Sequence, residues 1–123
     1  MTEHTCPYCD FDEYDVIEKN DFGVILPEIN PLSKGHCVII PRRHVSSFFD
    51  VTDKERTGLQ NLLELARNDL QIRCQPEGFH IAFNDGKVFG EDAAEHFHIH
   101  IIPRYENQVL KLDRRWGILS DSA

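Results

Sequence analysis

The chain has 123 residues, of which 41% are hydrophobic and 28% are charged, and its formal net charge is −8. These values are typical of one soluble globular domain with a real core, which we place over residues 1–123. The acidic balance argues against a nucleic-acid polymer as partner, and no apolar run is long enough to cross a membrane. Because the first residues lack the basic start and apolar core of a signal peptide, we expect a cytoplasmic protein.

Two of the four cysteines lie near the start of the chain as Cys6-x-x-Cys9. In a cytosolic chain this pattern indicates metal binding or redox activity before it indicates a disulfide. The spacing suits a structural zinc site, which needs two more ligands, and His44 and a histidine from a later row are the candidates. Two free thiols are the alternative, and a redox role is less favoured because no helix is evident after Cys9. Cys37 lies in an apolar run, so we expect a buried, inert thiol.

The first half of the chain predicts two short strands separated by an irregular loop. Residues 21–26 and 36–40 are apolar runs of strand length, and Pro41 closes the second. Residues 27–35 contain two prolines and a glycine, which break regular structure.

One long helix is predicted over residues 52–73. Thr52 followed by Glu55 forms a capping-box pattern at its start. Behind the cap, apolar side chains recur at helical spacing, at Leu59, Leu62, Leu63, Ala66 and Leu70. A stripe of this kind usually packs in the core, but it could also supply a face to a partner subunit.

The second half of the chain predicts two more strands. Residues 79–84 form the first, and a polar loop over residues 85–95 leads to the second, at residues 96–102, which Pro103 ends. Residues 105–123 form a C-terminal tail that includes Trp116. Several strands with one long helix and short connections predict an α+β domain on an antiparallel sheet.

Three histidines alternate with apolar residues in the segment HFHIHII, residues 96–102. Because successive side chains of a strand point to opposite faces, Phe97 and Ile99 should face a core. His96, His98 and His100 should then form a row on the other face, about 6–7 Å apart.

Three interpretations of this row compete. The histidines could be structural residues on a solvent-facing strand, although three in strict alternation are hard to explain by packing. Two histidines at i and i+2 could share a metal ion. An imidazole nitrogen could instead attack an electrophilic phosphorus while its neighbours hold its tautomer and handle the leaving group's proton.

The histidine row resembles the defining motif of the histidine-triad (HIT) superfamily of nucleotide hydrolases and transferases. Three further segments resemble the same family in the same order: the Cys-x-x-Cys of its zinc-containing bacterial members, a Gly-His-x-Leu-Val-Ile-Pro-Lys-x-His segment and an Asn-x-Gly segment. They stand at residues 6–9, 35–44 and 83–86. The resemblance implies a HIT-like fold, with a five-stranded antiparallel sheet, one long helix and a short helix, and it implies a homodimer.

The resemblance also implies a role for each matching position. His98 would be the nucleophile that forms a transient nucleotidyl-histidine, and His100 would lie beside the phosphate and the leaving group. Glu28 would bond the ribose hydroxyls, Asn84 would contact phosphate or organise the loop, and His36 would belong to the substrate-binding set. Cys6, Cys9, His44 and His96 would hold a structural zinc ion that fastens residues 1–20 to the sheet.

The chain departs from the family just before the histidine row. Many relatives carry Gly-Gln-Ser/Thr-Val-x-His there, whereas this chain has GEDAAEH at residues 90–96. Three carboxylates, those of Glu91, Asp92 and Glu95, stand near the expected phosphate position, where like charges repel. They either point to solvent, or they favour a protonated imidazole or receive a cationic leaving group such as an amine.

The sequence is therefore compatible with three functions. The first is hydrolysis or transfer on a nucleoside phosphoramidate, a dinucleoside polyphosphate or a similar nucleotide through covalent His98. The second is a nucleotide-binding regulatory protein whose catalysis is reduced or lost because of the altered loop. The third is a metalloprotein whose histidine row holds a catalytic metal ion.

Overall fold

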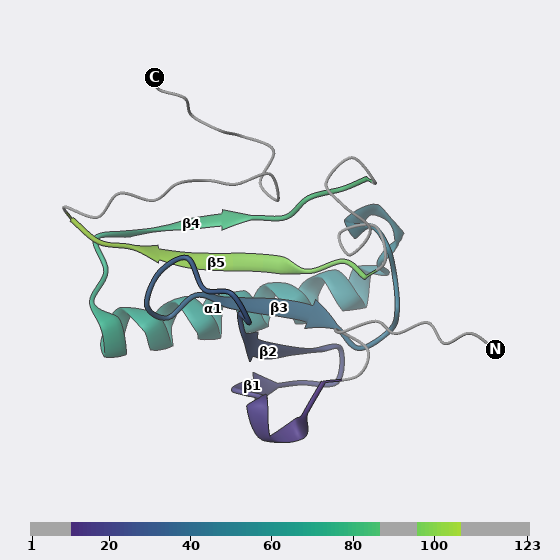
Figure 1. Ribbon diagram of the computed structural model, residues 1–123. Helices are drawn as coiled ribbons and strands as arrows, with labels where there is room; N and C mark the ends of the chain where they lie inside the picture. The colour runs from purple at the N-terminus through teal and green to yellow at the C-terminus, as the bar shows by residue number, and fades with distance from the viewer. Residues whose placement is uncertain (1–10, 87–95, 107–123) are drawn as a thin grey trace.

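A computed structural model describes residues 11–86 and 96–106, which form a five-stranded sheet with one long helix lying along one of its faces (Figure 1). The strands stand in the order β1-β2-β3-β5-β4, and every neighbouring pair is antiparallel. Their bounds are Glu18–Lys19 for β1, Gly23–Pro27 for β2, Cys37–Pro41 for β3, Gly78–Ala82 for β4 and Ile99–Arg104 for β5. The predicted α+β fold and its antiparallel sheet are confirmed.

Helix α1 spans Asp53–Cys74, so the prediction for this segment is correct to one residue at each end. Its capping box is formed as expected: the Thr52 hydroxyl accepts from the Glu55 amide, and the Glu55 carboxylate accepts from the Thr52 amide. The helix stops because Gln75 turns into the left-handed region at φ 51° and a proline follows. In place of the short helix, the described residues hold two single-turn 3₁₀ helices, Glu13–Asp15 and Phe48–Asp50.

The main core fills the space between α1 and the facing side of the sheet. The apolar stripe of α1 packs there against the alternate residues of the strands, and the buried members include Leu59, Leu62, Ala66, Leu70, Ile25, Ile39, Phe97, Ile99 and Ile101. The stripe is therefore core within this subunit. Cys37 belongs to the same cluster, which confirms that it is buried, and burial raises the pKa of its thiol to about 12.

The opposite face of the sheet holds a second, smaller apolar cluster, made of Val24, Leu26, Val38 and Ile40. His100 pairs with Val38 across β3 and β5, so its side chain lies on this face, away from α1. The predicted division of the histidine segment is thus correct for His100 and for Phe97, Ile99 and Ile101, which lie in the core with α1.

The bounds of the histidine strand differ from the prediction. Strand β5 starts at Ile99, because the Phe97 amide donates to the Val45 carbonyl, beyond the end of β3. It also continues through Pro103, which was expected to end it. The Pro103 carbonyl accepts from the Ser33 hydroxyl on the β3 side, and the nitrogen of a strand residue points the same way as its carbonyl. Pro103 therefore lacks an N–H only on the β3 side, and the hydrogen bonds between β4 and β5 are unaffected.

The remaining strand predictions are shifted by one to two residues. The strands predicted at residues 21–26, 36–40 and 79–84 are observed as Gly23–Pro27, Cys37–Pro41 and Gly78–Ala82. Within the described part of the chain, no helix has both the length and the apolar character needed to cross a membrane.

Candidate active site

His98 stands just before β5, half-buried, with its ring beside that of His100 at 4.8 Å between ring centres. Its Nδ1 lies 3.0 Å from the backbone carbonyl oxygen of His96. A carbonyl oxygen only accepts hydrogen bonds, so Nδ1 of His98 must carry a proton and donate it. In a neutral ring the proton is then absent from Nε2, so this nitrogen carries the lone pair with which an imidazole attacks an electrophile.

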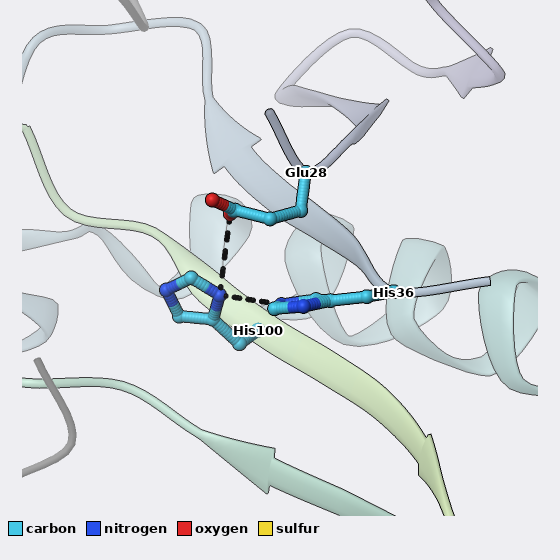
Figure 2. Close-up of side chains that lie close together, drawn as sticks. All are labelled: Glu28, His36 and His100. Carbon is cyan, nitrogen blue, oxygen red and sulfur yellow. Dashed lines mark hydrogen bonds and ion pairs between the residues drawn. The ribbon is translucent and has the colours of Figure 1, made fainter. Parts of the chain in front are cut away.

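His100 and His36 form a buried pair of imidazoles on the face of the sheet opposite α1. The distance from His36 Nε2 to His100 Nδ1 is 3.0 Å (Figure 2). On the other side of the His36 ring, the Leu32 backbone amide donates to Nδ1 at 3.0 Å. His36 directly precedes β3, and Gly35 before it takes φ +93°, a left-handed conformation that favours glycine.

Glu28 directs its carboxylate at this pair of imidazoles. Its Oε1 lies 3.6 Å from His100 Nδ1, its Oε2 accepts from the Asn30 amide, and its side chain is only 6% exposed (Figure 2). Its predicted contact with ribose hydroxyls stays a prediction. The ligand atoms of Glu28, His36 and His100 lie within 4.8 Å of one another, which makes this cluster a candidate metal site among the described residues.

Asn84, the other predicted substrate contact, lies two residues beyond the end of β4 and is half-buried. Strand β4 pairs with β5 at Ala82 and His100, so continuing this register brings Asn84 level with His98. The three loop carboxylates at Glu91, Asp92 and Glu95 lie outside the described residues.

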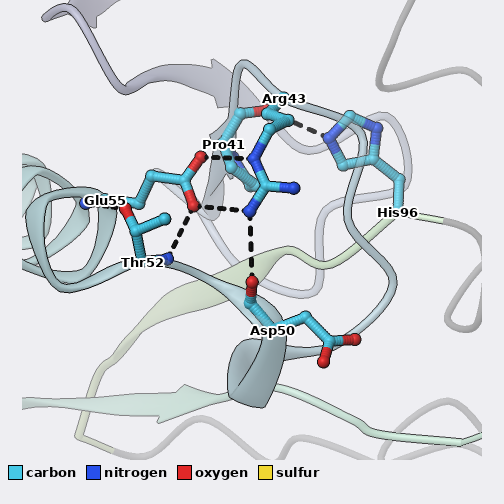
Figure 3. Close-up of polar contacts among 6 residues, drawn as sticks. All are labelled: Pro41, Arg43, Asp50, Thr52, Glu55 and His96. Carbon is cyan, nitrogen blue, oxygen red and sulfur yellow. Dashed lines mark hydrogen bonds and ion pairs between the residues drawn. The ribbon is translucent and has the colours of Figure 1, made fainter.

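His96 does not continue the row formed by His98 and His100. Its fully buried ring turns towards β3, where Nε2 donates to the Pro41 carbonyl at 3.0 Å (Figure 3). Its other neighbour is the ring of His44, at 4.8 Å between ring centres. Burial lowers the pKa of His96, as do the nearby His44 and His98, while the Pro41 hydrogen bond raises it.

This arrangement suits a pair of zinc ligands. A neutral His96 with its proton on Nε2 keeps a lone pair on Nδ1, and a backbone carbonyl that orients the ring is typical of metal-ligating histidines. Two imidazoles match half of a Cys₂His₂ donor set. The two cysteines predicted to complete it, Cys6 and Cys9, lie outside the described residues.

An ion pair that the sequence did not predict anchors the segment bearing His44. Arg43 donates to both carboxylate oxygens of Glu55 at 2.8 Å and to the Asp50 carbonyl at 3.1 Å (Figure 3). The hydrogen bond from Arg43 is the main reason that the pKa of Glu55 falls to about 2. Glu55 was identified only as a helix cap, and nothing in the sequence links it to a residue twelve positions earlier.

A family model described as the HIT domain matches residues 12–107. The chain belongs to the HIT family. This membership confirms the family resemblance and accounts for the five-stranded sheet with its long helix.

Two curated relatives show how far this HIT domain resembles named proteins. It is 28% identical over 109 residues to an uncharacterized HIT-like protein, MG132, from Mycoplasma genitalium, covering 85% of this chain and 77% of that one. It is 30% identical over 90 residues to a Mycobacterium tuberculosis protein named AP-4-A phosphorylase, covering 73% of this chain but only 46% of the relative.

Solved structures resemble the HIT domain to a similar degree. Diadenosine triphosphate hydrolase from Plasmodium falciparum, solved with cyclomarin A, has a TM-score of 0.73 and 26% identity over 79% of this chain and 65% of that one. A zinc-bound histidine triad family protein from Mycobacterium smegmatis has a TM-score of 0.69 and 24% identity over 81% of this chain and 75% of that one. At that identity, the second structure shows the shared fold alone.

Proposed function

We propose that this HIT domain hydrolyses or transfers a nucleotidyl group through a covalent intermediate on His98. The proposal rests above all on the hydrogen bond from His98 Nδ1 to the His96 carbonyl, which leaves Nε2 unprotonated and beside His100. The substrate class is a nucleoside phosphoramidate, a dinucleoside polyphosphate or a similar nucleotide. The named activities of the mycobacterial phosphorylase and the Plasmodium hydrolase favour nucleotide substrates.

The reaction would proceed in two displacements at phosphorus. The lone pair of His98 Nε2 forms a bond to phosphorus, and the bond from phosphorus to the leaving group breaks with its electron pair. Water then attacks the same phosphorus and loses one proton to solvent, the phosphorus–nitrogen bond breaks with its electron pair returning to His98 Nε2, and a nucleoside monophosphate is released. The His96 carbonyl holds the ring throughout and stabilises the positive charge that Nδ1–H shares in the intermediate.

A quenched-flow experiment tests this proposal. The protein is mixed with a nucleoside phosphoramidate or a dinucleoside polyphosphate, quenched, digested and analysed by mass spectrometry. We expect the peptide containing His98 to gain the mass of one nucleotidyl group. Turnover without that adduct, or an adduct on another residue, would contradict the mechanism.

The second candidate is a nucleotide-binding regulatory protein without turnover. It is favoured by the carboxylates of Glu91, Asp92 and Glu95, which stand where relatives carry a glutamine and a hydroxyl residue. Nucleotide binding measured by calorimetry, with no turnover across both substrate classes, would support it over the enzyme.

We also propose that the protein holds one structural zinc ion on Cys6, Cys9, His44 and His96. When bound, the ion would link the start of the chain to the sheet, and it would take no part in phosphorus chemistry. The neutral ring of His96, which the Pro41 carbonyl orients, and its contact with His44 support this assignment.

We further propose that the protein is a homodimer in the cytoplasm. Light scattering of the purified protein tests whether it forms a dimer.

A further inference from the structure

The loop between β2 and β3 carries the carboxylate of Glu28, and a backbone hydrogen bond closes it. The Glu28 amide donates to the His36 carbonyl at 3.1 Å, which joins the two ends of the loop. Within the loop, the Asn30 amide donates to Glu28 Oε2 at 3.3 Å. The direction of this carboxylate therefore depends on the path that the loop backbone takes.

This loop arises because the pairing between β3 and β5 stops early. The ladder ends at Cys37 and Ile101, whereas β5 continues to Arg104. Pro103 lies in the remaining part of β5 and has no N–H to donate towards β3. Regular pairing could not continue past the proline, so the chain before β3 leaves the sheet and forms the loop.

Two hydroxyl groups bind the loop to β5 and to the residue that follows it. The Ser33 hydroxyl donates to the Pro103 carbonyl at 2.6 Å, and the Tyr105 hydroxyl donates to the Lys34 carbonyl at 2.8 Å. The loop, dark blue in Figure 1, accordingly lies beside the end of β5. Ser33 is only 8% exposed, so water does not readily replace its bond. The hydroxyls thus hold the loop where a strand would otherwise have paired.

Packing prevents the loop from moving in the other direction, towards the core. A Cβ added at Gly35 would lie 2.9 Å from Leu70 Cδ2 and 3.2 Å from both Cys74 Sγ and Pro103 Cγ. The backbone at Gly35 therefore already lies close against the end of α1 and against β5. The two hydroxyls oppose movement away from these elements, so the loop has one well-defined position relative to β5.

We infer that the hydroxyls of Ser33 and Tyr105 are positioning groups that hold the Glu28 carboxylate for the ribose hydroxyls of the nucleotide. They would thereby set a preference for nucleotides that carry these hydroxyls over nucleotides that lack them. This inference rests on the proposed function, in which Glu28 bonds the ribose while His98 attacks phosphorus. His98 directly precedes β5, so binding the loop to β5 fixes the carboxylate relative to the nucleophile. A displacement of about 1 Å would take the carboxylate out of hydrogen-bond range.

A purely structural role for the hydroxyls predicts different behaviour. Loss of such a bond would lower stability and weaken all nucleotides alike. A positioning role acts through Glu28, so it would weaken only those nucleotides that offer ribose hydroxyls. It would also disappear once the Glu28 carboxylate has been replaced, because two residues that act as one unit are not additive.

A double-mutant cycle separates the two roles. Calorimetry measures the affinity for a nucleoside monophosphate and for its 2′,3′-dideoxy analogue in the unmodified protein, Glu28→Gln, Ser33→Ala and the double variant. We expect either single variant to bind the ribonucleotide about 10-fold more weakly and the dideoxy analogue less than about 2-fold more weakly, as for one lost hydrogen bond to a charged group. The double variant should be no weaker than Glu28→Gln alone. Equal weakening of both ligands, or losses that multiply in the double variant, would overturn the inference.

Tyr105→Phe is the second variant, and it decides the question if Ser33→Ala does not fold. It removes one hydroxyl and keeps the ring, and the same selective loss for the ribonucleotide is expected. Ser47→Ala is the matched control, because its hydroxyl accepts from the Phe49 amide in a different loop. The control should keep the full preference for the ribonucleotide. An unchanged preference in Tyr105→Phe and Ser33→Ala would contradict the role of the hydroxyls.

Hydrogen exchange in the free protein tests the loop without a nucleotide. The His36 amide donates to the Ser33 carbonyl, and the Glu28 amide donates to the His36 carbonyl. We expect both amides to exchange at least about 10-fold faster in Ser33→Ala, because the loop would open locally more often. The Phe97 amide, which donates to the Val45 carbonyl, serves as the reference and should not change. Unchanged exchange at Glu28 and His36 would overturn the inference.

The measurements also distinguish this inference from the proposed function. Equal affinity of the unmodified protein for the two nucleotides would overturn the inference and leave covalent catalysis by His98 standing. Absence of the adduct on His98 would contradict the proposed function, whereas a ribose preference that follows the cycle would still support the positioning role. Failure to bind either nucleotide would contradict both.

Discussion

The rings of His44 and His96 lie 4.8 Å apart between their centres, although 52 positions of sequence separate them. His96 donates its Nε2 proton to the Pro41 carbonyl, so in a neutral ring its Nδ1 carries the lone pair. These two rings are half of the proposed zinc site, and they come from the segment after β3 and the segment before β5.

The first prediction concerns this zinc ion. Elemental analysis of the purified protein should find about one zinc per chain. The double variant Cys6→Ser with Cys9→Ser should lose the zinc, and its melting temperature should fall by roughly 5 °C or more, because metal binding contributes to folding. Cys74→Ser is the matched control, since it removes one thiol outside the site and should keep the metal. Zinc that persists in the double variant would contradict the ligand assignment.

The second prediction concerns the ion pair between Arg43 and Glu55. The pKa of Glu55 in the folded protein, about 2, lies below the ordinary value of 4.5, so the unfolded chain binds more protons between these pH values. The stabilisation is complete above pH 4.5 and is lost as the pH falls towards 2. Since Arg43 is 52% exposed, we expect Glu55→Gln to lower the free energy of unfolding by only about 1–2 kcal/mol at pH 7.

Urea denaturation at pH 7, 4 and 2.5 measures this effect. The difference between the unmodified protein and the glutamine variant should shrink as the pH falls. Asp53→Asn is a suitable comparison, because Asp53 pairs with Arg56 on the exposed surface of the same first turn. A difference that stays constant across the pH range would show that the Glu55 carboxylate has no such role.

The third prediction concerns the reactivity of Cys37. Burial raises its pKa to about 12, so at pH 8 only roughly one molecule in 10⁴ would carry the thiolate that reacts with alkylating reagents. Iodoacetamide should therefore modify the half-buried Cys74 much faster than Cys37 in the folded protein. Peptide mapping by mass spectrometry measures both, and in urea the two should react at similar rates. Rapid labelling of Cys37 in the folded protein would contradict its place in the core.

The sequence was sufficient to predict the faces occupied by Phe97, Ile99 and His100, but not the place of His96, whose buried ring turns towards β3. Alternation alone placed Phe97 and Ile99 in the core and His100 on the other face. Successive side chains of an extended chain point to opposite faces, so residues two positions apart share a face. The capping box of α1 could also be predicted, because its two residues, Thr52 and Glu55, are only three positions apart in the sequence.

The hydrogen-bond partners of the histidines could not be predicted in this way. His96 bonds Pro41 and His36 bonds Leu32, and both contacts depend on the path of irregular backbone after a strand or before one. No periodicity specifies such a path, so the three histidines of the row could not be distinguished by environment from spacing alone. Family resemblance supplied their expected roles, and the structure supplied the hydrogen bonds that make those roles chemically consistent.

The last prediction tests the nucleophile. His98→Asn removes the attacking Nε2, while the asparagine side chain can still donate to the His96 carbonyl in place of Nδ1. We expect kcat to fall by roughly 10³-fold or more, since no other group of the site would form the covalent intermediate. The affinity for a nucleoside monophosphate, measured by calorimetry, should change by less than about 10-fold. His80→Asn is the control, because it makes the same substitution on β4, at a position that the proposed site does not use. Full turnover in the His98 variant would contradict covalent catalysis, whereas loss of binding together with turnover would indicate that His98 holds the substrate rather than attacks it.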